Sequence, residues 1–309
     1  MSRHDHAMEL ASSTEELTTE AIDTRFDRID EMSTAELATL MNDADAAVPL
    51  AVQAALPSIA AAIDGIVRRM AGGGRLIYVG AGSSGRIGVL DASECPPTFG
   101  TRPDQVVAII AGGSSAIVTP SEGAEDDEDR GSAAMVDAEV SAADAVVGIA
   151  SSGKTPYVVA ALRAARDRGA LTVGLSCNAN AALSGVVDHP IEVLVGPEVV
   201  AGSTRLKAGT AQKLVLNMLS TITMVRLGKT FGNLMIDLRP TNAKLRERAI
   251  GIVGHIAGVG RDDARAALDQ TEFNVQHAVL VLRLGISPAA ARSRLDSAGG
   301  LLKTAMEAP

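Results

Sequence analysis

The chain has 309 residues, enough for one large domain and a smaller one, and 47% of them are apolar, which is ample for a buried core. With 37 acidic against 28 basic residues the formal net charge is −9, which argues against binding to nucleic acid or to an anionic membrane surface. Two cysteines, a polar and acidic start, and no apolar run approaching ~20 residues argue against a disulfide framework, a signal peptide and a membrane span, so we expect a soluble cytoplasmic protein.

The first 48 residues are predicted to form a helical segment of their own. Residues 1–20 read as a loose, charged start, and residues 22–41 are expected to contain one or two short helices. A longer helix is predicted over residues 49–70, where apolar side chains recur at roughly helical spacing. Three glycines at positions 72–74 end that helix.

Five short apolar runs follow, with helix-compatible stretches between them. Strands that alternate with helices predict an α/β fold, a doubly wound parallel sheet that is covered on both faces. In such sheets ligands bind at the carboxyl ends of the strands, near a topological switch point. The predicted strands are residues 75–80, 106–111, 145–150, 171–175 and 191–195.

A segment rich in glycine and serine comes directly after the first predicted strand. Glycines at positions 80, 82 and 85 surround Ser83 and Ser84, and residues 87–92 suit a helix. A strand, a Gly/Ser loop and a helix N-terminus present N–H groups to an anion, which predicts a phosphate site. The G-x-G-x-x-G spacing of this loop is by itself a weak indication of a dinucleotide site.

Glu94 follows this predicted helix, and Pro96 and Pro97 are expected to stop the helix just behind it. The prolines would then fix a carboxylate near the end of the anion-binding segment. The alternative interpretation is an ordinary surface residue at the end of a helix.

A second hydroxyl-rich loop follows the third predicted strand. It contains Ser151, Ser152, Lys154 and Thr155, and Pro156 suits the first turn of the next helix. Hydroxyls, N–H groups and a helix N-terminus converge there, as in a phosphate site; the alternative is a turn with a capping hydroxyl. The matching loop after the first strand favours the phosphate site.

An acidic stretch, residues 119–129, lies beyond the second predicted strand. Thr119 and Glu122 have capping-box spacing, so we expect a helix to begin there. Glu122 and Glu125 would lie one turn apart, and one of them could point inward while residues 126–129 face solvent. Carboxylates beside a phosphate site suggest acid–base chemistry on a sugar phosphate, for which their pKa values must differ.

A long helix is predicted over residues 204–227, capped by Ser203, with Arg205 and Lys207 in its first turn. Positive charge is unfavourable at that end of a helix. Either a nearby anion compensates it, or the two side chains extend into water. Strand signals end at Pro240, beyond which short helical stretches predict a small helical domain.

No metal site is indicated, because the five histidines show no ligand spacing beyond His4 and His6 near the start. Cys95 has no neighbouring histidine in the sequence, and both it and Cys177 are interpreted as structural residues. No Ser–His–Asp arrangement is suggested, because the serines cluster where a phosphate would bind.

Several motifs resemble those of the N-acetylmuramic acid 6-phosphate etherase family. They are D-A-S-E-C-P-P-T-F-G at 91–100, E-G-A-E-D at 122–126, S-G-K-T-P-Y-V at 152–158, and residues 196–213, a stretch shared with glucokinase regulatory proteins. The resemblance covers nearly the whole chain. It implies a sugar isomerase (SIS) domain over residues 49–239, with a five-stranded parallel sheet, and a small ubiquitin-associated (UBA)-like helical domain over residues 240–309.

The resemblance implies a carbon–oxygen lyase that removes the 3-O-lactyl ether of N-acetylmuramic acid 6-phosphate by elimination and water addition. The products are N-acetylglucosamine 6-phosphate and D-lactate, within the catabolism of cell-wall amino sugars. Glu94 would be the general acid and Glu125 the base at C2. The residues that match phosphate-binding positions are Ser83, Ser84, Ser151, Ser152 and Thr155. A homodimer without metal or organic cofactor is implied.

The alternative is a sugar-phosphate-binding regulator without catalysis, of the glucokinase-regulatory type. Such relatives have two SIS domains in a longer chain and lack the motif around Glu94. One such domain and both carboxylates are present here, which favours the enzyme. An aldose–ketose isomerase also needs a carboxylate base at C2, but the motif at 91–100 would have no role in it.

Overall fold

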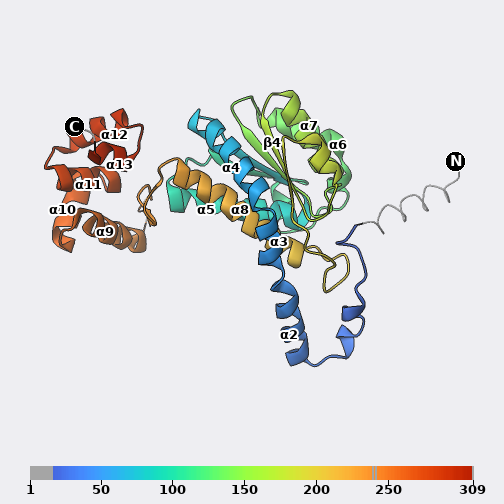
Figure 1. The fold of residues 1–309 in the computed structure, drawn as a ribbon. Coiled ribbons are helices and arrows are strands. Elements are labelled where there is room, and N and C mark those ends of the chain that lie inside the picture. The colour runs from blue at the N-terminus through green and yellow to red at the C-terminus, as the bar shows by residue number, and fades with distance from the viewer. Residues whose placement is uncertain (1–16, 239, 241, 308–309) are drawn as a thin grey trace. The chain divides into compact units, whose positions relative to one another are not determined.

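The computed structural model describes residues 17–238, 240 and 242–307, which form two compact units. The first unit contains the described residues up to Ala92, together with Asp104–Leu219. The second contains Ser93–Pro103 and the described residues from Ser220 onward. The domain boundaries expected at residues 48 and 239 stay predictions. Figure 1 shows the elements of each unit.

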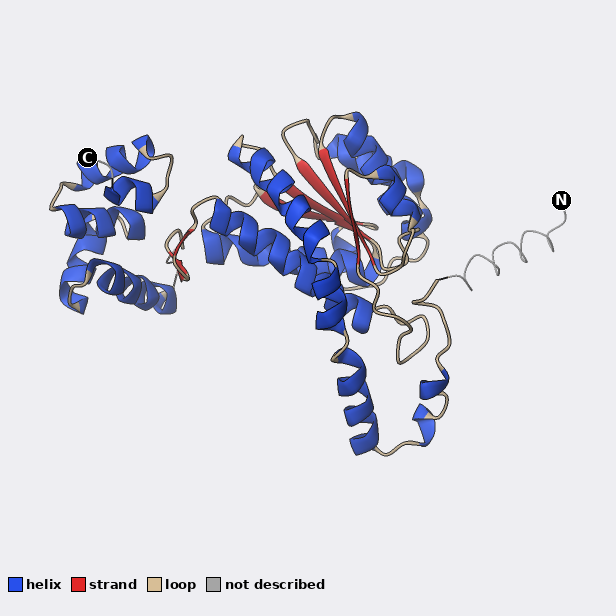
Figure 2. Ribbon diagram, viewed as in Figure 1, coloured by secondary structure: helices blue, strands red, loops and turns tan. Residues whose placement is uncertain are grey.

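A five-stranded parallel sheet forms the centre of the first unit (Figure 2), as predicted. The strand order is β2-β1-β3-β4-β5, so the order of the strands reverses between β1 and β3. The last strand begins and ends earlier than predicted, because it pairs with β4 from His189 to Glu192. The strands are β1 (Leu76–Gly80), β2 (Val106–Ile110), β3 (Ala145–Ile149), β4 (Leu171–Ser176) and β5 (His189–Glu192).

Helices cover both faces of this sheet. One helix, α4, packs against β3, β4 and β5, and α7 packs against β1, β3 and β4 from the other side, with α6 beside it (Figure 1). The first unit contains α2 (Thr34–Asp45), α3 (Val48–Ala54), α4 (Leu56–Ala71), α6 (Glu128–Asp137) and α7 (Pro156–Asp167). Two helices, α5 (Gly82–Phe99) and α8 (Lys207–Arg226), begin in the first unit and end in the second. The helix predicted over residues 49–70 is therefore two helices, because Pro57 starts a new one.

Short 3₁₀ helices connect these elements. They are η1 (Thr24–Phe26), η2 (Ile29–Glu31), η3 (Ser114–Ile117), η4 (Ala124–Asp126) and η5 (Ala182–Val186). Within the described residues no single helix is both long and apolar enough to cross a membrane. One bent pair, Thr34–Ala54 with Leu56–Ala71, meets that test by length and composition.

The second unit is mainly helical, as predicted for the end of the chain. Its helices share one hydrophobic core with a short antiparallel hairpin of β6 (Thr230–Phe231) and β7 (Leu234–Met235). The helices are α9 (Ala243–Ala257), α10 (Arg261–Gln270), α11 (Val275–Leu284), α12 (Pro288–Ser297) and α13 (Leu302–Glu307), of which the last was not predicted. The likeness to a UBA fold stays a prediction.

The prediction that Pro96 and Pro97 stop the helix behind Glu94 is wrong. The helix α5 continues through both prolines to Phe99. A proline removes one hydrogen bond from a helix, and this loss is tolerated near the helix end. Gly100 ends α5 instead, with a φ of 63° and an N–H that donates to the carbonyl of Pro96 at 3.0 Å.

Gly100→Ala is expected to destabilise the second unit by ~2–5 kcal/mol. The new Cβ would adopt a left-handed conformation and would lie 1.9 Å from the carbonyl oxygen of Asp237. Gly258→Ala is the matched control, because Gly258 has a φ of 73° and nothing within 4 Å of its Cβ position. Denaturant unfolding should show a smaller loss for the control, and equal losses would contradict the steric argument.

Candidate active site

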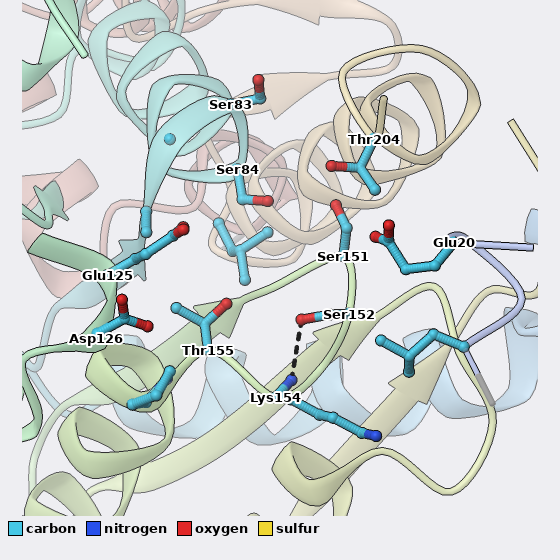
Figure 3. A pocket seen from close by; sticks show the side chains of 15 residues that line it. Glu20, Ser83, Ser84, Glu125, Asp126, Ser151, Ser152, Lys154, Thr155 and Thr204 are labelled. Carbon is cyan, nitrogen blue, oxygen red and sulfur yellow. Dashed lines mark hydrogen bonds between the residues drawn. The ribbon is translucent and has the colours of Figure 1, made fainter. Parts of the chain in front are cut away.

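A cavity of about 510 Å³ opens where the carboxyl ends of β1 and β3 lie side by side (Figure 3). This is the point at which the strand order reverses, where ligands bind in such sheets. Among the described residues that line it, Lys154 is the only cation. The lining residues are Leu17, Glu20, Ala81, Gly82, Ser83, Ser84, Glu125, Asp126, Ile149, Ser151, Ser152, Lys154, Thr155, Pro156 and Thr204.

The first turn of α5 forms one wall. The predicted Gly/Ser loop is part of this helix, because α5 begins at Gly82 rather than near residue 87. Ser83 and Ser84 therefore lie in the first turn, where backbone N–H groups have no partner within the helix and the helix dipole favours an anion. Gly80 and Gly85 allow the turn to pack on β1, since a Cβ on Gly80 would lie 2.8 Å from the nitrogen of Gly85.

The loop after β3 forms the opposite wall. The carbonyl of Ser151 accepts hydrogen bonds from the N–H of Cys177 and from Nδ2 of Asn178, both at 2.9 Å. The hydroxyl of Ser151 accepts one from Nε2 of the buried Gln212 at 2.8 Å. Gly153 has a φ of 67°, and a Cβ there would lie 2.3 Å from that of Ala181. The shape of this loop is therefore fixed by its contacts.

The helix α7 begins at Pro156, as predicted, which leaves Thr155 in the N-cap position. The side chain of Thr155 makes no capping hydrogen bond. The alternative of a capping hydroxyl is therefore wrong for Thr155. Its hydroxyl lies on the cavity, as does that of Ser152, whose Oγ accepts a hydrogen bond from the N–H of Lys154 at 3.2 Å (Figure 3).

Glu125 lines the cavity from η4 and is exposed to solvent within it. The helix predicted to begin near residue 119 is absent from this described stretch, since Gly123 adopts a φ of 71° and α6 begins at Glu128. Asp127 caps α6 by accepting a hydrogen bond from the N–H of Arg130 at 2.9 Å. Glu122 is not among the described residues that line this cavity; it lines a smaller cavity of about 210 Å³, which Glu125 also borders.

Glu94, the predicted acid, is not among the described residues that line this cavity. It is exposed and follows Gly82 by twelve residues on α5. Glu94 belongs to the second unit, whereas all the lining residues belong to the first. The preceding turn is fixed by Asp91, whose buried carboxylate accepts hydrogen bonds from the Tyr78 hydroxyl at 2.8 Å and from Asn217 at 2.7 Å.

The charge conflict predicted at the start of the long helix is resolved by Glu198. The helix α8 begins at Lys207 rather than at residue 204. The buried carboxylate of Glu198 accepts hydrogen bonds from the N–H groups of Lys207 and Ala208, both at 2.9 Å. Burial lowers the pKa of Lys207, whose amine donates to the carbonyl of Val195 at 2.9 Å. Arg205 lies before the helix and is exposed to solvent.

Sequence reasoning missed the contribution of the N-terminal segment to the cavity. The start predicted to be loose includes Leu17 and Glu20, which line the cavity, and Thr19, which is fully buried. Residues 1–16 lie outside the described part of the chain. The sequence gave no indication that Thr18 and Thr19 hold Glu20 in place, because the residue that binds both threonines, Asn178, is distant in sequence.

The cysteines are buried, as expected of structural residues. Burial raises the pKa of Cys177 to about 12, so this thiol is not an activated nucleophile. In the parts of the chain that the structure describes, no group of three or more His, Cys, Asp or Glu side chains is arranged to hold a metal ion.

Comparisons with known proteins identify the family of the chain. Residues 58–166 match the family of the glucokinase regulatory protein N-terminal SIS domain, and residues 118–222 match the SIS domain family. The chain is 53% identical to an N-acetylmuramic acid 6-phosphate etherase from Streptomyces avermitilis, over 100% of this chain and 99% of that one.

Two further relatives with the same name are similar over nearly their full lengths. The protein from Rubrobacter xylanophilus is 55% identical, over 94% of this chain and 96% of its own. The protein from Escherichia coli O139:H28 is 50% identical, over 95% of this chain and 98% of its own. At this identity and coverage, the chain belongs to the N-acetylmuramic acid 6-phosphate etherase family.

Proposed function

We propose that this protein cleaves the 3-O-lactyl ether of N-acetylmuramic acid 6-phosphate, giving N-acetylglucosamine 6-phosphate and D-lactate. The reaction makes it a carbon–oxygen lyase of cell-wall amino sugar catabolism. The observation that carries the proposal is the cavity at the β1/β3 switch point, where the hydroxyl groups of two loops and the carboxylate of Glu125 meet. Membership of the etherase family supports the substrate.

The 6-phosphate is proposed to bind between the two helix N-termini. Ser83 and Ser84 on α5 line the same cavity as Ser151, Ser152 and Thr155, which follow β3. Hydroxyl donors and free N–H groups at helix N-termini are suited to a phosphate. This arrangement holds a dianion in a chain of net charge −9 without a cluster of cations.

The proposed chemistry begins when the sugar ring opens to an aldehyde, which acidifies the proton at C2. Glu125 removes that proton, and the electron pair forms the C2–C3 double bond as the C3–O bond breaks. Glu94 protonates the departing lactyl oxygen. Water then adds to C3, and C2 regains a proton.

The position of Glu94 supports a homodimer. Because Glu94 is exposed and is not among the described residues that line the cavity of its own chain, we assign the acid to the partner subunit's Glu94. Leu90, one turn earlier on α5, is 52% exposed, and exposed apolar side chains are suited to an interface. A cytoplasmic location is proposed, where the two thiols stay reduced.

The first prediction concerns the oxygen that enters the product. In water enriched in ¹⁸O, elimination followed by water addition should place the label on the C3 hydroxyl of N-acetylglucosamine 6-phosphate and leave lactate unlabelled. Carbon-13 isotope shifts distinguish C3 from C1, where the open-chain aldehyde exchanges oxygen on its own. Label in the lactate hydroxyl would instead show direct hydrolysis of the ether.

The second prediction separates the two carboxylates. Glu125→Gln should abolish both lactate release and exchange of the C2 hydrogen with D₂O, because the base is lost. Glu94→Gln should lower lactate release by ~10²–10⁴-fold while C2 exchange persists. Proton NMR of the substrate measures exchange, and an enzymatic assay measures lactate. The reverse pattern would exchange the two roles.

The third prediction concerns the subunits. Co-expressed Glu94→Gln and Glu125→Gln chains should recover about a quarter of the wild-type rate, because half of the dimers are mixed and each has one intact site. Each variant expressed alone is the control. If both carboxylates acted within one chain, mixing would recover nothing, and a monomer on sizing chromatography would also exclude the shared site.

A further inference from the structure

We propose that Glu20 is a third carboxylate of the active site, which accepts hydrogen bonds from hydroxyl groups of the bound sugar. This inference rests on the proposed binding of a sugar phosphate in the cavity. It assigns a ligand contact to the N-terminal segment, residues 17–20, which the motifs of the family did not include.

The N-terminal segment is held in place by one buried amide. The Oδ1 atom of Asn178 accepts hydrogen bonds from the Thr18 hydroxyl at 2.9 Å and from the N–H of Thr19 at 3.4 Å. Its Nδ2 donates to the Thr19 hydroxyl at 3.0 Å and to the carbonyl of Ser151 at 2.9 Å. Thr19 is 0% exposed and Asn178 is 2% exposed. Asn178 therefore connects the segment that carries Glu20 to the loop proposed to bind phosphate.

The carboxylate of Glu20 faces the cavity beside Gly202. A Cβ on Gly202 would lie 2.7 Å from Oε2 of Glu20, so glycine at this position leaves room for the carboxylate. In Figure 3, Glu20 and Thr204 lie on the side of the cavity opposite Glu125 and Asp126. Among the described residues, none forms an ion pair or a hydrogen bond with the Glu20 carboxylate. Its acceptor capacity is available to a ligand.

The chemistry of the ligand determines which part of it faces Glu20. An ionised carboxylate only accepts hydrogen bonds, so it would repel both a phosphate and a lactyl carboxylate. The sugar hydroxyls are donors, and their hydrogen bonds to a charged acceptor are stronger than those between neutral groups. A sugar whose phosphate lies among the serines can therefore place its hydroxyls between Glu20 on one side and Glu125 on the other.

Binding measurements on two ligands test the assignment. Calorimetry on the full chain would compare inorganic phosphate with N-acetylglucosamine 6-phosphate, for the wild type, Glu20→Ala and Glu20→Gln. We expect Glu20→Ala to lower the affinity for the sugar phosphate by ~10- to 100-fold and to leave the affinity for inorganic phosphate within ~2-fold of the wild type. The affinities of Glu20→Gln should be intermediate. The kcat/KM for lactate release should fall in parallel with the affinity for the sugar phosphate.

Two controls isolate the effect. Asp30→Asn removes an exposed carboxylate from the same N-terminal region, outside the cavity, and should change neither affinity. Ser151→Ala should lower the affinity for both ligands, because the Ser151 hydroxyl belongs to the proposed phosphate site.

Three results would overturn the inference. Equal losses for both ligands in Glu20→Ala would show that Glu20 only maintains the cavity. Tighter binding of the sugar phosphate by Glu20→Ala would show that the charge of Glu20 repels the ligand. Unchanged binding would show that Glu20 makes no contact with the ligand. Wild-type protein that binds neither ligand and releases no lactate would overturn the proposed function itself, and the inference with it.

Discussion

The backbone contact between the end of β1 and the first turn of α5 determines where the cavity lies. Gly80 and Gly85 approach so closely that a side chain on either would collide with the backbone of the other. This contact aims the N-terminus of α5 at the carboxyl edge of the sheet. Because the strand order reverses between β1 and β3, the N-terminus of α7 reaches the same edge, and the two helix dipoles converge on one space.

The cavity proposed to bind a phosphate has more acidic than basic side chains among its described lining residues. The buried Lys207, for which the sequence left a nearby anion as one possibility, donates to the carbonyl of Val195 and begins a helix that Glu198 caps. Hydroxyl groups of Ser83, Ser84, Ser151, Ser152 and Thr155 line the cavity, and Glu20, Glu125 and Asp126 line it as well. The proposed division of roles leaves the acidic groups free for proton transfer and for recognition of hydroxyls.

The sheet and the two hydroxyl-rich segments that line the cavity could be predicted from the sequence because both depend on local patterns. Short apolar runs indicated the five strands, and serines beside glycines indicated the two segments that contain Ser83 and Ser151. Helix starts were predicted less well, since α6 and α8 are capped by Asp127 and Glu198 instead of the residues that local spacing favoured. Contacts between residues distant in sequence decide the rest: Asn178 fixes residues 17–20, and no local pattern reports this contact.

The four hydrogen bonds of Asn178 have a thermodynamic consequence for the start of the chain. They join the N-terminal segment to the carbonyl of Ser151, so an occupant that orders this loop also favours the docked state of the segment. Coupling of this kind is reciprocal: a docked segment must raise the affinity of the loop for its occupant by the same factor. Residues 17–20 belong to the same chain as this loop, so their local concentration beside it does not change on dilution.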